Sequence, residues 1–153
     1  MAFDSKNRLN MVRMGGATLS GTTPSNTSLV DMQGYEDLTV YLTTGTVTDA
    51  GAAAGFTLKL QHSDTTAAAD FVDCAAAEVI PRSTGATTIS VTSDSDDNIA
   101  VGSIGYRGGK RYVRAVVTGT ALTDAAYVAF GIRANFSQQS APVPSVTTAT
   151  AAT

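Results

Sequence analysis

The sequence has no tryptophan, a single histidine and a single cysteine. Because one cysteine, Cys74, cannot form a disulfide within the chain, folding needs no oxidising compartment. One histidine leaves little material for proton transfer or for a metal site. These scarcities predict a protein that is not an enzyme and that uses no cofactor and no metal.

Charge is also scarce, and it is weighted towards acid. Charged residues make up 15% of the chain and the net charge is −3, whereas nucleic-acid binders present a basic surface to phosphates. No apolar run approaches the roughly 20 residues that span a membrane, and none follows the first charged residues as a signal peptide would require. We therefore expect no nucleic acid and no membrane among the partners, and assembly in a bacterial cytoplasm.

Alanine and threonine fill about a third of the chain. Apolar and polar residues alternate in short segments separated by turn residues, which is typical of half-buried strands. The three alanine clusters are too short to sustain helices, so we expect loops there. The pattern predicts an all-β fold, an antiparallel β-sandwich or jelly roll. The alternating segments are residues 38–43, 56–61, 88–92, 99–104, 113–118 and 127–133.

The alternation also predicts which side chains form the core. A glycine, Gly102, interrupts one segment and permits a β-bulge. On the expected registers, the side chains that face the opposite sheet are Leu58, Leu60, Val113, Val117, Val128, Phe130 and Ile132.

Composition divides the chain into an N-terminal arm (1–26), a sandwich domain (27–136) and an extended C-terminal arm (137–153). We expect at most one short strand, near residues 17–20, in the first arm. The second arm has no charge and two prolines that favour extended backbone. Both arms are candidates for binding a partner, through the apolar or proline residues Phe3, Leu9, Met11, Val12, Met14, Pro142, Val143 and Pro144.

Few side chains suggest chemistry. His62 ends an expected strand, where we expect it to be solvated, and Cys74 lies in an apolar stretch, where we expect an inert, half-buried thiol. The acidic run from Asp94 to Asn98 resembles a calcium loop, but Ile99 and Gly105 stand where an EF-hand needs glycine and glutamate. A solvated turn is the favoured interpretation, with weak calcium binding as the alternative.

The densest basic group lies in and after a glycine-rich turn. It consists of Arg107, Lys110, Arg111 and Arg114. The turn lacks the glycine and hydroxyl residues of a phosphate-binding loop. Two interpretations remain open: a solvated strand face, or a contact with an acidic surface of a partner protein.

Two sequence blocks resemble a known family. Residues 56–64 and 70–73 are similar to an F-x-x-K-L-Q-x-S-D…F-x-D-V block, and residues 98–117 to an I-G-Y-x-G-x-K-R-Y-V-R-V-x-V block. Both blocks occur in small structural proteins of tailed bacteriophages, several of which are capsid cement (head decoration) proteins. The resemblance covers about residues 35–134. It departs from the pattern at residues 65–69, which replace an Asp-Gly-Ser turn, and at Phe71, which replaces a tryptophan.

The resemblance implies a virion protein on the capsid exterior that binds the major capsid protein. We also expect self-association, with a trimer favoured over a dimer, because capsid shells offer three-fold sites and exposed strand edges need cover. Two alternatives stay open. One is another virion component, such as a head–tail connector, tail or fibre protein. The other is a carbohydrate-binding sandwich, which the lack of tryptophan disfavours.

Overall fold

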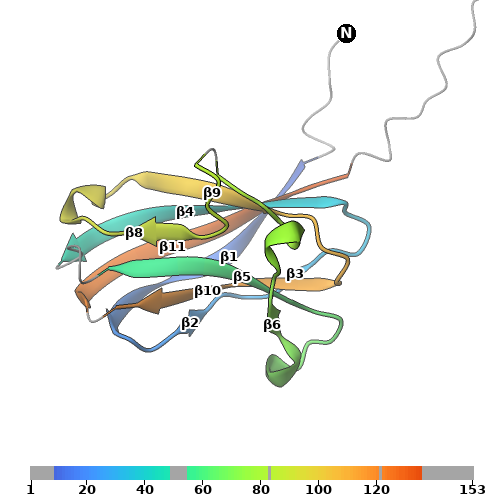
Figure 1. Cartoon of the computed structure of the whole chain (residues 1–153), viewed down its shortest axis with the longest axis horizontal. Helices are drawn as coiled ribbons and strands as arrows, with labels where there is room; N and C mark the ends of the chain where they lie inside the picture. The colour runs from blue at the N-terminus through green and yellow to red at the C-terminus, as the bar shows by residue number, and fades with distance from the viewer. Residues whose placement is uncertain (1–8, 49–54, 83, 121, 136–153) are drawn as a thin grey trace, which may run out of the picture.

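The computed structural model describes residues 9–48, 55–82, 84–120 and 122–135, and in these residues two antiparallel sheets pack face to face (Figure 1). Sheet A has the strand order β1-β11-β4-β9-β7. Sheet B has the order β2-β10-β5-β6, with β3 also paired to β10 and β8 to β5. The predicted all-β sandwich is confirmed, and its finer assignment as a jelly roll stays a prediction.

The strands are β1 Leu9–Gly21, β2 Ser25–Asn26, β3 Val30–Asp31, β4 Asp37–Thr48, β5 Phe56–Ser63, β6 Val72–Asp73, β7 Val79–Ile80, β8 Ile89–Val91, β9 Ala100–Tyr106, β10 Tyr112–Gly119 and β11 Leu122–Ala134. Three single turns of 3₁₀-helix, at Ala68–Asp70, Ala76–Glu78 and Asp94–Asp96, connect them. Two of these turns fall in the alanine clusters where we expected loops. Within the described ranges, no helix has the length and apolar character to cross a membrane.

Strands β4, β5 and β10 alternate as expected. Their inward side chains are almost completely shielded from solvent and the residues between them are on the outer face, where Arg114 and Val116 of β10 are also buried. Fully buried examples are Leu38, Val40, Leu42, Leu58, Val113 and Val117. In β9, the register shifts between the pairs Leu42–Gly102 and Thr43–Ala100, so the predicted bulge beside Gly102 is confirmed.

The N-terminal segment differs from the expected arm. The prediction of at most one short strand there is wrong, because β1 pairs with β11 from Leu9–Ala134 to Gly21–Leu122. Met14 is fully buried in the core. A register shift between Arg13 and Gly15 interrupts the alternation that would have marked the strand in the sequence. Most of the expected arm is therefore part of the sandwich.

The register predicted for β11 is also wrong. Val128 is 45% exposed, and Phe130 and Ile132 lie on the same outer face. The inward positions are instead Ala125, Tyr127, Ala129 and Gly131. Space is tight at Gly131, where an added Cβ would lie 2.7 Å from Cδ1 of Leu38. Shifting a strand by one residue exchanges its two faces, so Val128, Phe130 and Ile132 point outwards.

Candidate partner-binding surfaces

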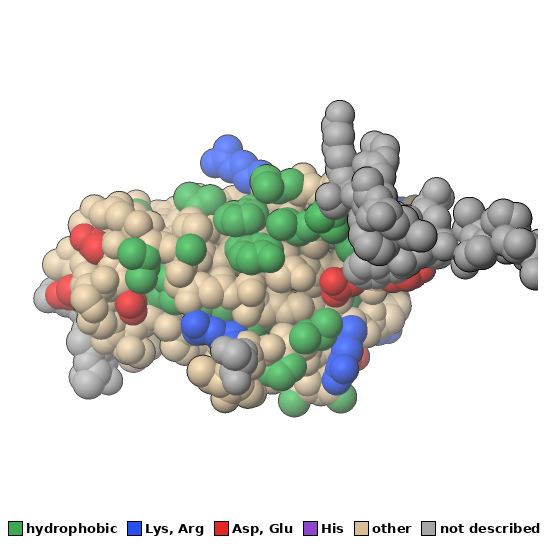
Figure 2. Space-filling view, turned by 90° about the horizontal axis from the view of Figure 1, so that it is seen from above, with side chains coloured by type: hydrophobic (Ala, Val, Ile, Leu, Met, Phe, Trp, Pro, Cys, Tyr) green, Lys and Arg blue, Asp and Glu red, His purple; other side chains and the backbone are tan. Residues whose placement is uncertain are grey.

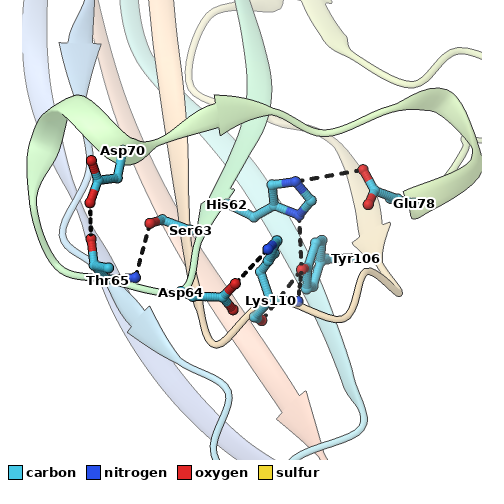
Figure 3. Close-up of polar contacts among 8 residues, drawn as sticks. All are labelled: His62, Ser63, Asp64, Thr65, Asp70, Glu78, Tyr106 and Lys110. Atoms are coloured by element: carbon cyan, nitrogen blue, oxygen red, sulfur yellow. Dashed lines mark hydrogen bonds and ion pairs between the residues drawn. The ribbon is translucent and has the colours of Figure 1, made fainter.

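The two blocks that carry the family resemblance meet on the adjacent strands β5 and β10, and the second block also includes β9 of sheet A. Strand β5 pairs with β10 from Phe56–Gly119 to Ser63–Tyr112. The ends of these strands and the turn before β10 are connected by polar contacts (Figure 3). The fold therefore brings together residues that are about fifty positions apart in the chain.

His62 is at the centre of these contacts. It is 4% exposed, so the prediction of a solvated histidine is wrong. Its Nδ1 lies 3.0 Å from the hydroxyl of Tyr106, and its Nε2 lies 3.7 Å from Oε2 of Glu78. The Tyr106 hydroxyl also accepts a hydrogen bond of 2.9 Å from the backbone N–H of Lys110. His62 and Tyr106 thus hold the turn before β10 against the end of β5.

Replacing Tyr106 by phenylalanine is expected to lower the free energy of unfolding by about 1–3 kcal/mol, because the buried partners of the hydroxyl lose their hydrogen bonds. Urea denaturation measures this loss. Tyr112→Phe is the matched control, because no hydrogen bond of its hydroxyl stabilises the described part of the fold, and its stability should stay within about 0.5 kcal/mol of wild type. Equal losses in both variants would contradict a structural role for the Tyr106 hydroxyl.

Tyr106 also makes stability depend on alkaline pH. Burial raises its pKa from 10.0 to about 12. The unfolded state therefore releases this proton at a lower pH than the folded state, and the contribution to stability falls as pH rises from 10 towards 12. Tyr106→Phe should flatten the pH dependence of the unfolding free energy in this window, and an unchanged slope would contradict this cause.

Two carboxylates secure the loop after β5. Asp64 pairs with Lys110, whose hydrogen bond lowers the pKa of the carboxyl, and Asp70 accepts a hydrogen bond from the hydroxyl of Thr65. Ser63 Oγ accepts a hydrogen bond of 3.0 Å from the backbone N–H of Thr65. The loop that departs from the family pattern is thus fixed by its own side chains.

The basic group, for which a solvated face and a partner contact were both open, is engaged within the chain. Arg111 donates two hydrogen bonds, of 2.9 and 3.1 Å, to Asp31, and it lowers the pKa of that carboxyl. Lys110 pairs with Asp64, and Arg107 Nε donates to the carbonyl of Ala77 at 2.8 Å. An acidic partner surface would have to compete with these contacts.

The outer face of sheet B carries what we call the sheet B network, made of Lys59, Gln61, Asp73 and Arg114. Arg114 is 9% exposed and donates to Gln61 Oε1 at 2.7 and 3.0 Å. Its guanidinium lies 4.3 Å from the centre of the Phe71 ring. Lys59 and Gln61 each donate to Asp73 at 2.7 Å, and both bonds lower the pKa of its carboxyl. This face is polar and its groups satisfy one another.

The remaining candidates for chemistry are structural where they are described. Cys74 is half-buried, and burial raises the pKa of its thiol to about 12, so it stays protonated at neutral pH. In the acidic loop, the carboxylate of Asp97 accepts a hydrogen bond from the backbone N–H of Val47. Among the described residues, no group of three or more His, Cys, Asp or Glu is arranged so that it could hold a metal ion.

The candidate partner-binding residues of the two arms differ in how accessible the structure leaves them. Leu9 and Met11 are 46% and 70% exposed, whereas Val12 is partly buried against the core and Met14 is fully buried. A partner can therefore reach the first two side chains but not Met14. Phe3, Pro142, Val143 and Pro144 lie outside the described residues.

The outer face of sheet A carries an apolar surface that the sequence prediction missed. Figure 2 looks onto this face and shows hydrophobic side chains gathered in its middle. The rings of Tyr41 and Phe130 stack there, with centroids 5.2 Å apart and planes 9° from parallel. We call this surface the sheet A patch; its members are Met11, Tyr41, Val128, Phe130 and Ile132. The apolar residues of the patch are visible in the sequence, but the alternation in β11 led us to expect Val128, Phe130 and Ile132 on the inner face.

No family model matches the chain, and no curated protein matches it.

Proposed function

We propose that the chain is a capsid cement protein of a tailed bacteriophage. It would bind the outside of the head and stabilise contacts between major capsid protein subunits, after assembly in the bacterial host cytoplasm. The observation that carries this proposal is the position of the two family-like blocks. Residues 56–64 and 70–73 lie on β5, the loop after it and β6, whereas residues 98–117 include β9, the turn after it and β10. Polar side chains of the two blocks are each other's partners.

This arrangement supports a structural role for the residues of the two blocks that match the family pattern. Side-chain hydrogen bonds connect the strands on the outer face of sheet B, through Lys59, Gln61 and Arg114. An ion pair between Asp64 and Lys110 joins the loop after β5 to the turn before β10. A cement protein needs a rigid body, because a flexible one would lose conformational entropy each time it bound the shell. Repetition of weak contacts over many sites of a shell would then supply avidity.

The copy number in purified virions tests the proposal. Virions of the phage that encodes the chain are dissociated, and the protein is quantified by mass spectrometry against the major capsid protein. A cement protein is expected at a copy number of the same order as the capsid protein. A handful of copies per particle would indicate a connector, tail or fibre component instead, and absence from the virion would overturn the proposal.

A shortened chain of residues 9–135 tests the role of the arms. It retains β1 and Met14, so it is expected to unfold cooperatively with near wild-type stability. It is expected to bind intact capsids at least tenfold more weakly in co-sedimentation, because it lacks Phe3, Pro142, Val143 and Pro144. Chains lacking only 1–8 or only 136–153 separate the two contributions. Unchanged affinity in all three would place the capsid contact on the sandwich.

A further inference from the structure

The two outer faces of the sandwich have opposite chemistry. The outer face of sheet B carries the ionic and amide side chains of the sheet B network. The sheet A patch has apolar and aromatic side chains at its centre, and Met11 and Val128 expose 70% and 45% of their surface. Outward strand positions normally carry polar residues. A large exposed apolar patch on a small domain marks an interaction surface.

The polar groups around the sheet A patch are already satisfied or lie at its border. The hydroxyl of Thr43 donates to the carbonyl of Val128 at 3.2 Å, within the sheet itself. Arg13, which pairs with Phe130 across β1 and β11, is on the edge strand, where its long side chain can turn to solvent. With the Arg13 side chain turned outwards at this rim, a partner covering the patch would bury apolar surface and leave that charge in water.

We propose that a second copy of this chain covers the sheet A patch, so that two sandwiches pack through the outer faces of their A sheets. A copy of the chain brings an equally uncharged centre, so the two faces meet without unpaired charges. Outer faces of sheets pack well when their strands are roughly aligned, at about 30°. Such a contact uses the same surface on both subunits and closes with two copies. It therefore favours a dimer, where the sequence alone led us to expect a trimer.

The size of the face is sufficient for a specific contact. Strands β1, β11 and β4 carry the patch, and with a spacing of about 4.8 Å and an overlap of about ten residues they give a face on the order of 500 Å². Two such faces bury on the order of 1,000 Å², the lower limit for specific interfaces. The dimer should therefore be of moderate affinity and should respond strongly to one charge at its centre. The inference concerns the isolated chain and goes beyond capsid binding.

Light scattering and sedimentation velocity of the purified full-length chain test this proposal over a concentration series. Wild type is expected to reach twice the 15.6 kDa mass of one chain. Val128→Lys should weaken self-association at least tenfold, because it places a charge in the buried centre. Val72→Lys is the matched control, since Val72 is an exposed valine (57%) on β6 of sheet B. It should leave the dimer unchanged.

Three outcomes would overturn the proposal: a monomer at the highest concentration, a trimer, or equal effects of the two lysine variants. Met11→Lys provides a second disruption if Val128→Lys proves unfolded by circular dichroism. Capsid co-sedimentation of the same proteins separates this inference from the proposed function. If the wild-type chain is a monomer and Val128→Lys no longer binds capsids, the patch is a capsid-binding surface and the dimer proposal fails. If the chain is a dimer that does not bind capsids, only the proposed function fails.

Discussion

Replacing Met14 by aspartate is expected to abolish most of the stability of the sandwich. Met14 is fully buried, and its Sδ lies 3.4 Å from the position that a Cβ on Gly131 would occupy. Losing the side chain alone costs about 2–5 kcal/mol, and an unpaired carboxylate in the core adds a desolvation cost. The total, above about 4 kcal/mol, is a large part of the 5–15 kcal/mol that holds a typical domain together.

Met11→Asp is the matched control, three positions earlier on the same strand. Its side chain is 70% exposed, so the unfolding free energy of the monomer should change by less than about 0.5 kcal/mol. Urea denaturation at low protein concentration, followed by circular dichroism, measures both variants. If Met14→Asp were as stable as Met11→Asp, β1 would not belong to the core, and the segment would be the arm first expected.

Gly55→Ala is expected to be the most damaging single-methyl change in the described chain, at about 3 kcal/mol or more. Gly55 has φ +131°, a conformation that side chains rarely adopt, and an added Cβ would lie 2.2 Å from the carbonyl oxygen of Val91. That oxygen belongs to β8, which pairs with the start of β5. Relief of the clash would require the β5–β8 pairing to move.

Gly85→Ala separates the clash from the backbone strain. Gly85 also has a positive φ, of +82°, but among the described residues beyond its chain neighbours no heavy atom lies within 4 Å of its potential Cβ. Its cost should be limited to the left-handed backbone penalty of about 1–2 kcal/mol. Thermal unfolding of both variants gives the comparison. Equal losses would mean that close packing at Gly55 contributes nothing.

The fold class and most of the strands follow from the sequence because the alternation is unambiguous. Leu38, Val40 and Leu42 alternate with threonine and tyrosine, so only one face of β4 is a suitable core face. The same holds for Leu58 and Leu60 in β5. In these strands, local pattern and tertiary packing favour the same register.

Strand β11 fails this test because both of its faces are apolar. Size favours burial of Val128, Phe130 and Ile132, but the space opposite the strand is already filled by Leu38 and Met14. Tyr127 completes the inward face, where its hydroxyl donates to Ser25 Oγ at 2.8 Å. The register of β11 could therefore be predicted only with Met14 placed in the core, and the bulge in β1 hides that placement from the sequence pattern.

The contacts among the candidate residues could not be predicted from the sequence, for a different reason. The blocks that contain His62 and Tyr106 were recognised separately, but contacts such as His62–Tyr106 span 44 positions and depend on the pairing of distant strands. The basic residues were identified, but their acidic partners were not. Asp31 is 80 positions from Arg111, and no local spacing rule connects the two.

The pairing of β1 with β11 has a consequence for synthesis of the protein. In the described chain, the main partner of the first strand of sheet A is the last strand to be made, since Leu9 lies opposite Ala134. Closing so long a stretch of chain is entropically slow. On the ribosome, Met14 therefore reaches its place in the core only after residues 129–131 of β11 have emerged from the exit tunnel. Sheet A is therefore completed only after β11 has been made, and a circular permutant that joins residues 9 and 134 by a short turn should fold faster.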